Sequence, residues 1–394
     1  MANQPNSTFL KEKRIIVYND AKNFGGHEVM TLRAIRLLLS KCASVSCFYC
    51  PLNQKWESAL RGLETESPNL TLHEVELPKI RFHQPYHFFH PKLVRDMAES
   101  FKQLSPDLVF VAQGTLETSA VGALATLKAG LPCLSYIPLA HSFRELGSNR
   151  AFRRDLFNSY LAKTPTRWLT NGKAQVNRLK ERGANQPIDF LPNLVEIANP
   201  LPAGEAKQRL GFAQSDLVIG MCGRMDKQQK GCDIFIDAVR RAPKDSLLRQ
   251  ARLLFIGDGP YWVKMKEDLN NDGWVDSIKH VGWTDKPENY YSAFSLMVIP
   301  SRFEGLPVAM QEAILCDAPV AATAVDGMAD FLPANWTCKP KDPSALLRLI
   351  ESYIENPKGY RAPLEKLKAT IRTEYNHEAF EEALISSIDN TLRS

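Results

Sequence analysis

The sequence predicts an α/β fold of two doubly wound domains, each a parallel sheet flanked by helices. Short apolar runs bounded by turn residues alternate with longer amphipathic segments, and such alternation is typical of parallel sheets. The chain has 394 residues, enough for two domains of ordinary size. A stretch with three prolines, residues 192–202, separates the two alternating halves. We therefore expect domains at residues 1–195 and 196–375, followed by a terminal segment, residues 376–394.

The first half opens with a strand at residues 13–18 and an apolar-periodic helix from residue 29 onward. Gly25 and Gly26 lie between them, and a glycine pair there lets a ligand approach the backbone closely. The loop is not a dinucleotide fingerprint, because G-x-G-x-x-G is absent. The remaining strands and helices of this half are expected at residues 44–49, 56–63, 70–75, 91–104, 108–112, 118–128, 132–136, 149–162, 167–170, 173–181 and 188–191.

His141 follows the strand expected at residues 132–136. Doubly wound folds place their ligands just past the carboxyl ends of parallel strands, so this histidine is a candidate site residue. The alternative is a loop histidine whose nitrogens are satisfied by the backbone.

The second half opens with a strand at residues 217–222, followed by Arg224 and, six residues on, Lys230. Two cations ahead of a helix can neutralise a leaving diphosphate, although surface cations in such a place usually have no special role. Gly257 and Gly259 are followed by Trp262 where a dinucleotide fingerprint needs a third glycine, so an oxidoreductase is not favoured. Further strands are expected at residues 253–256 and 277–281, and helices at residues 287–294, 343–355, 360–373 and 377–392.

Residues 298–323 read as a strand, a loop, a helix and a second strand. Pro307 suits the first position of the helix, because its fixed φ fits there. The glycine beside the helix start, Gly305, and the free N–H groups of that helix favour an anion. Glu304 and Glu312 bracket this place, at most about 12 Å apart along a helical backbone. One carboxylate could accept hydrogen bonds from a sugar and the other from a ribose, with phosphate between them, or both could be ordinary solvated charges.

This stretch resembles the Glu-x7-Glu signature of retaining glycosyltransferases of the GT-B fold, glycosyltransferase family 4 (glycosyl transferases group 1). Pro-Ser-x-x-Glu-Gly at its start, Glu-Ala after the helix turn and Pro-Val-x-Ala-Thr at its end all match. The resemblance implies two Rossmann-like domains facing across a cleft, and a terminal helix that crosses back to the first domain. It also implies transfer of a hexose-type sugar, with retention, from a nucleotide-diphosphate sugar to a glycan or lipid-linked acceptor. No metal or cofactor is expected besides the donor.

By the same resemblance, Glu312 binds the ribose, Arg224 and Lys230 bind the diphosphate, and Glu304 and His141 hold the sugar. The resemblance also implies three backbone contacts. The backbone of Gly25 and Gly26 faces the donor phosphates or the acceptor, and that of Gly305 and Leu306 assists in binding the diphosphate. The backbone near Val281 and Gly282 borders the base. Leu306 and Pro307 stand where relatives often have Phe-Gly. Phosphorolysis, nucleotide-sugar epimerisation and a non-catalytic nucleotide-sugar-binding protein remain alternatives.

Charge is placed unevenly along the chain. Residues 1–195 contain 25 Lys and Arg against 16 Asp and Glu, a net charge of +9, whereas the rest has −4. A basic half suggests an anionic membrane surface or a phosphorylated acceptor, and nucleic acid is not favoured because no recognition motif accompanies the charge. The helix at residues 149–162, with Arg150, Arg153 and Arg154 opposite apolar residues, could dock to anionic lipid or simply pack its apolar stripe.

The chain shows no stretch of about 20 apolar residues and no signal-peptide pattern, so a cytoplasmic protein, peripheral on a membrane at most, is expected. The eight cysteines read as reduced core thiols, and Cys47 and Cys50 lack the partners of a zinc set. Residues 77–91 contain His83, His87 and His90. A loop that contacts acceptor or membrane, or simply packs on the surface, is favoured there over a metal site, because two prolines disturb helical spacing.

Overall fold

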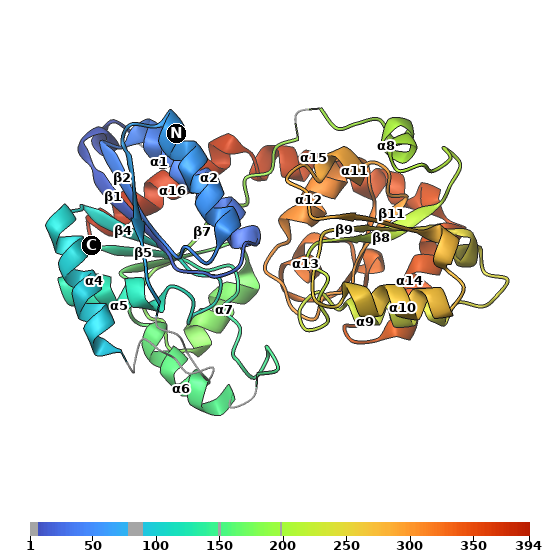
Figure 1. Cartoon of the computed structure of the whole chain (residues 1–394), viewed down its shortest axis with the longest axis horizontal. Coiled ribbons are helices and arrows are strands. Elements are labelled where there is room, and N and C mark those ends of the chain that lie inside the picture. Colours follow the sequence, from blue (N-terminus) through green and yellow to red (C-terminus); the bar gives the residue numbers. More distant parts are fainter. Residues whose placement is uncertain (1–6, 78–89, 149–150, 198) are drawn as a thin grey trace. The chain divides into compact units, whose positions relative to one another are not determined.

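The computed structural model describes residues 7–77, 90–148, 151–197 and 199–394 (Figure 1). The chain folds into two compact units. The first comprises Met1–Leu194 together with His377–Ser394, and the second comprises Val195–Asn376. The chain therefore leaves the first unit once and returns to it with its last helix.

The first unit contains a seven-stranded parallel sheet in the order β3-β2-β1-β4-β5-β6-β7. Its strands are β1 (Arg14–Asn19), β2 (Ser44–Tyr49), β3 (Leu70–Glu74), β4 (Leu108–Ala112), β5 (Cys133–Tyr136), β6 (Arg167–Thr170) and β7 (Ile188–Phe190). Its helices are α1 (Gly26–Lys41), α2 (Gln54–Glu66), α4 (Pro91–Leu104), α5 (Ala120–Ala129), α6 (Ala151–Leu161), α7 (Lys173–Glu181) and α16 (His377–Leu392). Helices cover both faces of the sheet, and α4 and α5 pack together against one of them (Figure 1).

The second unit contains a six-stranded parallel sheet in the order β10-β9-β8-β11-β12-β13. Its strands are β8 (Val218–Cys222), β9 (Arg252–Ile256), β10 (Ile278–Gly282), β11 (Leu296–Ile299), β12 (Val320–Thr323) and β13 (Thr337–Cys338). Its helices are α8 (Ala203–Arg209), α9 (Cys232–Arg240), α10 (Trp262–Asn271), α11 (Glu288–Tyr291), α12 (Val308–Leu315), α13 (Asp326–Phe331), α14 (Pro343–Glu355) and α15 (Arg361–Glu374). Helices α9, α10 and α14 cover one face, and α11, α12 and α15 the other (Figure 1).

The strands form where the sequence is continuously apolar, because a parallel sheet covered on both faces buries both sides of each strand. Every residue of β4, β11 and β12 is buried. Helix starts follow local chemistry: Asn53 caps α2 by accepting a hydrogen bond from the Trp56 backbone N–H, and Pro91 opens α4. The predicted doubly wound α/β fold is therefore confirmed in each unit.

Each sheet has one point at which the strand order reverses, and ligands of such folds bind outside the carboxyl ends of the strands there. In the first sheet this switch point lies between β1 and β4, and in the second between β8 and β11. These two edges are where candidate site residues are to be sought.

Two local expectations were wrong. The helix expected at residues 287–294 is a single α-helical turn, α11, because the hydrogen bonds that follow span three residues instead of four: Ala293 N–H donates to the Tyr290 carbonyl and Phe294 N–H to the Tyr291 carbonyl before β11 begins. Pro307 is not the first helical residue but the residue before it, with an extended ψ of 122°, and α12 begins at Val308. The fixed φ of −65° at Pro307 suits both positions, so the sequence does not separate them.

All eight cysteines are free thiols, and burial raises the pKa of both Cys47 and Cys50.

Among the described residues no group of three or more His, Cys, Asp or Glu side chains could hold a metal ion. His83 and His87 lie outside the described residues, whereas His90 is the N-cap residue of α4, and its side chain makes no capping hydrogen bond. None of the helices in the described ranges is long and apolar enough to cross a membrane.

Candidate active site

The switch point of the second sheet brings together several of the predicted site residues. Strand β8 ends at Cys222 and leads into Arg224, and strand β11 ends at Ile299 and leads into the loop with Glu304. Because β8 and β11 are parallel neighbours, both turns emerge at the same edge of the sheet.

Glu304 is a buried carboxylate with several donors around it. Lys230 Nζ donates to Glu304 Oε1 across 2.6 Å, and Ser301 Oγ donates to the same oxygen across 2.8 Å. Gln229 Nε2 lies 3.4 Å from Oε2. The side chain of Glu304 is only 6% exposed, so this charge depends on the paired cation beside it.

Arg224 lies at the rim of the same turn. Half of its side chain is exposed; its Nε donates to Asp226 Oδ2 across 2.6 Å and its Nη2 to Gln229 Oε1 across 3.0 Å. Asp226 also accepts the Gln229 backbone N–H at 2.7 Å, which fixes the turn. The arrangement presents one cation at the surface and a second, Lys230, deeper in the site.

Gly231 explains how Lys230 comes so close to the end of β11. Its φ is +64°, and a Cβ at this position would lie 2.1 Å from the carbonyl oxygen of Pro300. Only glycine tolerates both the backbone conformation and this approach. The Arg302 guanidinium further ties the two turns together through a bidentate pair with Asp233 at 2.7 Å.

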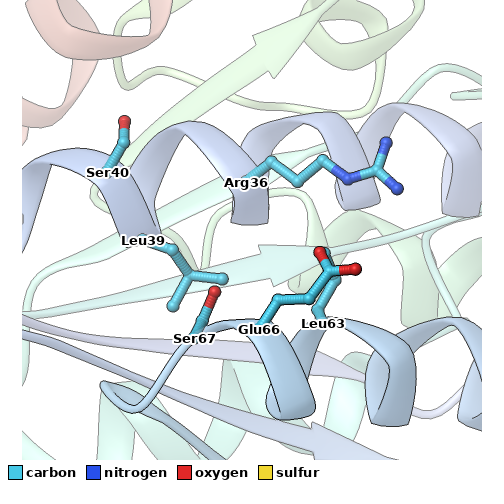
Figure 2. A pocket seen from close by; sticks show the side chains of 6 residues that line it. All are labelled: Arg36, Leu39, Ser40, Leu63, Glu66 and Ser67. Carbon is cyan, nitrogen blue, oxygen red and sulfur yellow. The ribbon is translucent and has the colours of Figure 1, made fainter.

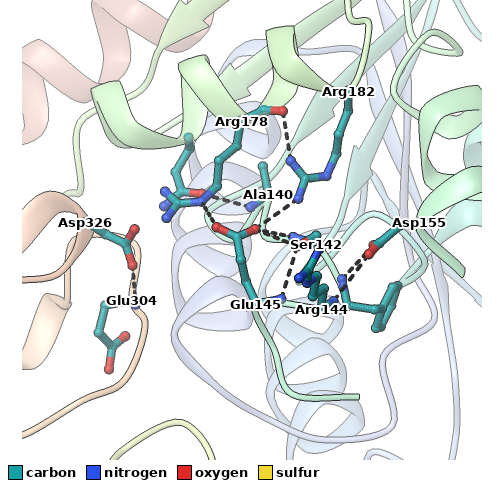
Figure 3. Close-up of polar contacts among 11 residues, drawn as sticks. Ala140, Ser142, Arg144, Glu145, Asp155, Arg178, Arg182, Glu304 and Asp326 are labelled. Atoms are coloured by element: carbon teal, nitrogen blue, oxygen red, sulfur yellow. Dashed lines mark hydrogen bonds and ion pairs between the residues drawn. The ribbon is translucent and has the colours of Figure 1, made fainter. Parts of the chain in front are cut away.

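The backbone of the Glu304 loop is held from α13. The Glu304 N–H donates to Asp326 Oδ2 across 2.8 Å (Figure 3). The Gly327 N–H donates to the Gly305 carbonyl across 3.1 Å. Gly305 and Leu306 are both buried, just ahead of α12. The loop geometry is therefore set by the protein itself.

Glu312 lies half-buried on α12 and meets the buried Tyr291 of α11. The Tyr291 hydroxyl donates to Glu312 Oε2 across 3.0 Å. Burial raises the pKa of the neighbouring Cys222 to about 12, and the charges of Glu312 and Lys230 both act on this thiol. Glu312 and the Lys230–Glu304 pair therefore lie around the same strand end, that of β8.

Val281 and Gly282 end β10, at the outer edge of the same sheet, two strands from β8. The Gly257 N–H donates to the Gly282 carbonyl across 2.7 Å. Gly257 has a φ of +113°, and a Cβ there would lie 2.2 Å from the Gly223 carbonyl oxygen. Backbone from three successive strand ends thus meets along one edge, next to the turn that contains Arg224.

Gly25 and Gly26 lie at the switch point of the first sheet, after β1, where Gly25 is the N-cap of α1 and Gly26 is its first residue. The Gly25 N–H donates to Oε2 of the fully buried Glu28 across 2.7 Å. Gly25 has extended backbone, and no atom lies within 4 Å of the place a Cβ of Gly26 would take. The protein's own packing therefore leaves the backbone at Gly26 open to approach.

His141 follows β5 on the same edge of the first sheet and is 2% exposed. Side chains from other elements bind the backbone N–H groups around it: Gln175 Oε1 accepts from Ala140 at 2.9 Å, and Asp155 Oδ1 accepts from Phe143 at 2.7 Å (Figure 3). Glu145 Oε2 accepts from the Ser142 N–H at 2.7 Å. The position of His141 is thus fixed by the loop rather than by its own side chain alone.

Glu145 is itself held by two arginines (Figure 3). Arg178 Nε donates to Oε1 across 3.0 Å and Arg182 Nη2 to Oε2 across 3.1 Å. Burial alone would raise the pKa of Glu145, but the hydrogen bonds from Ser142 and the pair with Arg178 outweigh it and lower the pKa to about 2. The carboxylate stays charged throughout the neutral range.

Within the second unit, Arg224, Lys230, Glu304 and Glu312 therefore gather around one switch point. Within the first unit, Gly25, Gly26 and His141 follow two strands of one sheet edge. Sequence reasoning did not find the side chains that position these residues, namely Tyr291, Asp226, Gln229, Ser301, Asp326, Gln175 and Glu145. Polar residues inside the turn between Arg224 and Lys230 were the available signal for two of them. Tyr291, Asp326 and Gln175 lie 21, 22 and 35 residues along the chain from their partners, whereas Ser301 and Glu145 lie only three residues from Glu304 and Ser142.

A surface pocket of about 240 Å³ lies elsewhere, between α1 and α2 (Figure 2). It is lined by Arg36, Leu39, Ser40, Leu63, Glu66 and Ser67. Five of these residues lie in the last turns of α1 and α2, and Ser67 follows α2 directly. This is the side of the sheet at which the parallel strands begin. The pocket is therefore remote from the switch point, and we assign it no part in the candidate site.

The family model described as glycosyl transferases group 1 matches residues 216–356. A 2-deoxystreptamine N-acetyl-D-glucosaminyltransferase of Streptomyces fradiae is 26% identical over 71% of this chain and 70% of its own length. A UDP-Gal:alpha-D-GlcNAc-diphosphoundecaprenol alpha-1,3-galactosyltransferase of Escherichia coli is 25% identical over 54% of this chain and 56% of its own.

Solved structures show the same architecture. Anabaena Alr3699/HepE in complex with UDP and glucose has a TM-score of 0.77 and 16% identity, over 96% of this chain and all of its own. Sucrose-phosphate synthase from Thermosynechococcus elongatus has a TM-score of 0.78 and 17% identity, over 97% of this chain and 99% of its own. At such identities the likeness establishes the fold of the two units.

Proposed function

We propose that this chain is a retaining glycosyltransferase, because its fold is GT-B and residues 216–356 match the family model of glycosyl transferases group 1. It moves a hexose-type sugar from a nucleotide-diphosphate sugar to a glycan or lipid-linked acceptor. The observation that best supports this activity is the grouping of two cations and two carboxylates, Arg224, Lys230, Glu304 and Glu312, around the end of β8. The resemblance drawn from the Glu-x7-Glu signature is confirmed by the matching domain.

The relatives support a nucleotide-sugar donor. The two curated relatives are named as transferases of N-acetylglucosamine and of galactose, the latter from a UDP donor to a diphosphoundecaprenol-linked sugar. The similar Anabaena protein was solved with UDP and glucose. These activities belong to those proteins, and for this chain they favour a UDP-sugar and an acceptor that is a glycan or a lipid-linked sugar.

The proposed chemistry follows from where charge develops. As the glycosidic bond to phosphate breaks, negative charge grows on the leaving diphosphate and positive charge on the sugar. Lys230 and Arg224 would stabilise the diphosphate, and Glu304 would face the sugar while remaining paired with Lys230. Glu312 would bind the ribose. In this scheme side-chain cations neutralise the leaving group, so no metal is required.

The proposed transfer retains the anomeric configuration of the sugar, and no side chain of the protein acts as a nucleophile in it. The Glu304 carboxylate is buried and accepts hydrogen bonds from Lys230 and Ser301, which suits electrostatic stabilisation better than covalent attack. The leaving phosphate would assist the acceptor's attack from the same face. NMR of the product would show the anomeric configuration of the donor, and an inverted product would reject this part of the proposal.

One assay separates the proposed transfer from its alternatives. The chain is incubated with UDP-, GDP- and ADP-sugars, with and without glycan and polyprenyl-diphosphate-linked acceptors, in the presence and absence of EDTA. Acceptor-dependent nucleotide release that survives EDTA is expected. Sugar 1-phosphate formed from inorganic phosphate would indicate a phosphorylase, an altered free donor would indicate an epimerase, and binding without turnover would indicate a non-catalytic protein.

We also propose that α6 makes a peripheral membrane contact, and the orientation of this helix supports the proposal. Its polar side faces the protein: Arg154 pairs with Glu117 at 2.6 Å, its guanidinium lies 3.2 Å from the centroid of the Phe143 ring, and Asn158 is buried. Arg154 is therefore occupied within the unit rather than open to lipid, whereas the sequence left open both docking of this helix to anionic lipid and packing of its apolar stripe. Arg150 lies outside the described residues.

The apolar side of α6 faces outward. Phe152, Leu156 and Tyr160 are 83%, 66% and 49% exposed, and their spacing of four residues puts them in one stripe. Arg153 is exposed beside them, and the first 195 residues have a net charge of +9. An exposed apolar stripe on a basic unit fits the surface of an anionic membrane, into which the rings would insert while the cations meet lipid phosphates.

A further inference from the structure

The hydroxyl of Tyr291 connects three elements of the second unit. Tyr291 ends α11, is 1% exposed, and donates to Glu312 Oε2 on α12 across 3.0 Å. The Cys222 thiol, at the end of β8, donates to the same hydroxyl with a sulfur–oxygen distance of 3.6 Å. The hydroxyl thus has one donor and one acceptor partner, which is a complete set for a buried group of this kind.

Burial keeps this hydroxyl protonated, because it raises the pKa of Tyr291 well above the ordinary tyrosine value. A protonated hydroxyl that accepts from Cys222 has its own hydrogen left to donate to Glu312. The carboxylate of a glutamate on a helix can otherwise adopt several rotamers, so this bond selects one of them.

We propose that Tyr291 is a positioning residue that sets the recognition of ribose by Glu312, and through it the preference for ribonucleotides over deoxyribonucleotides. The inference rests on the proposed function, in which Glu312 meets the ribose. A carboxylate offers about four lone-pair sites, so Tyr291 on one oxygen leaves the group able to accept ribose hydroxyls. The bond fixes where those sites point.

A purely structural role makes a different prediction. The Tyr291 ring belongs to the apolar core of the second unit, and packing alone would need the ring but not the hydroxyl. Tyr291→Phe keeps the ring and removes only the oxygen. A structural hydroxyl would change stability, whereas a positioning hydroxyl changes the ratio of affinities for ribose and deoxyribose ligands.

Calorimetry on the full chain tests this difference. UDP, GDP and ADP are titrated first, and the tightest is then compared with its 2′-deoxy and 3′-deoxy forms. In the native chain at least one deoxy form should bind about tenfold or more weakly, as loss of a hydrogen bond to a charged group implies. In Tyr291→Phe the ribonucleotide should weaken about tenfold, while the deoxy forms change little, so the ratio approaches one.

Two further variants complete the test. Tyr353→Phe removes a hydroxyl from another buried tyrosine of the same unit, packed edge-on against Tyr360 at 5.0 Å, and should leave the ratio unchanged. Cys222→Ala keeps the Tyr291 hydroxyl and removes its donor, and should shift the ratio in the same direction by a smaller factor. If Tyr291→Phe proves unstable, the Cys222→Ala variant alone still tests whether the Tyr291 hydroxyl affects the ratio of affinities.

The possible outcomes distinguish a failure of the positioning role of Tyr291 from a failure of the proposed glycosyltransferase function. Native discrimination that persists in both Tyr291→Phe and Cys222→Ala would overturn the positioning role while leaving the nucleotide-sugar activity intact. A native chain that binds ribose and deoxyribose forms equally would overturn the role of Glu312 on which the inference depends. Failure to bind any of the three nucleotides would overturn the proposed function as well.

Discussion

Lys230 Nζ lies 2.6 Å from Glu304 Oε1, and this ion pair joins the turn after β8 to the loop after β11. The two residues are 74 positions apart in the chain. Glu304 is almost fully buried and Lys230 is 23% exposed, so each charge depends on the other more than a surface pair would. The residue proposed to meet the diphosphate and the one proposed to meet the sugar are therefore a single electrostatic unit.

The pair predicts that its two members are energetically coupled. Lys230→Ala should lower kcat/KM by about 10²-fold or more, because it removes a charge aimed at the leaving group. It should also destabilise the second unit by about 3 kcal/mol, since it leaves a buried carboxylate without its cation. Adding Glu304→Gln to Lys230→Ala should cost less stability than the two single changes added together, as a thermal-melting cycle would show.

Lys227→Ala is the matched control for that cycle, because Lys227 lies in the same turn with 62% of its side chain exposed. It should change neither kcat/KM nor melting temperature appreciably. A folded Lys230→Ala variant with native kinetics would remove Lys230 from the site.

The exposed stripe of α6 predicts salt-sensitive membrane binding. The chain should sediment with vesicles rich in phosphatidylglycerol at low salt and be released as salt rises, because exposed charges are screened over about 10 Å at 0.1 M. Replacing both Phe152 and Leu156 by Asp should abolish sedimentation without lowering the melting temperature, since both side chains are exposed.

Leu127→Asp provides the comparison for α6, because Leu127 is an exposed leucine on α5 of the same unit. It should leave sedimentation unchanged. Binding that survives the double change in α6, or chain that stays in solution with anionic vesicles at low salt, would argue for a soluble acceptor and against this surface.

Glu145 predicts a defined pH dependence. Its pKa is about 2 in the folded chain, below the ordinary glutamate value of about 4.3. The charged group therefore favours the folded state fully above pH 4.3, and this contribution is lost as the pH falls towards 2. The melting temperature of Glu145→Gln should lie below that of the native chain by a constant gap from pH 7 to about 5, and the gap should narrow below pH 4.3.

Glu145→Gln should also lower turnover, because it loosens the loop that holds His141. A gap in melting temperature that does not change between pH 7 and pH 3 would show that the Glu145 carboxylate is not held as described.

Much of the fold follows from sequence because its signals are local. The helix α4 and the strand β4 match the predicted residues, since a strong 3.6-residue period and a continuous apolar run each identify one element. The single turn α11 could not be separated from a longer helix, because its end depends on how residues 291–294 pack into the core. The short helices α8, α10 and α13 were not expected. Helix α10 begins at Trp262, which the sequence analysis used only to show that a third glycine is missing.

The candidate site also has a part that local sequence signals predict and a part that depends on tertiary packing. Placing Arg224 and Glu304 at strand ends needs only the alternation of elements, and the structure agrees with it. The partners of Glu312 and Arg154 depend on tertiary packing: Tyr291 is 21 residues before Glu312, and Glu117 is 37 residues before Arg154. The inverted orientation of α6 could not be predicted, because an amphipathic pattern gives the two faces of a helix but not which one meets the protein.

The proposed order of the donor along the site depends on the two glutamates. If Glu312 meets the ribose, its contacts are similar in the ground and transition states, so Glu312→Gln should mainly weaken nucleotide binding. If Glu304 faces the sugar, where positive charge develops, Glu304→Gln should chiefly lower turnover. Glu267→Gln, at an exposed carboxylate on α10, is the control for charge alone.

Calorimetric titration of UDP and GDP into the Glu304→Gln and Glu312→Gln variants tests this account most directly. We expect the nucleotide that binds the native chain to bind Glu304→Gln almost as tightly and to bind Glu312→Gln about tenfold or more weakly. Loss of nucleotide binding in Glu304→Gln with native binding in Glu312→Gln would contradict the account and reverse the order of the donor in the site.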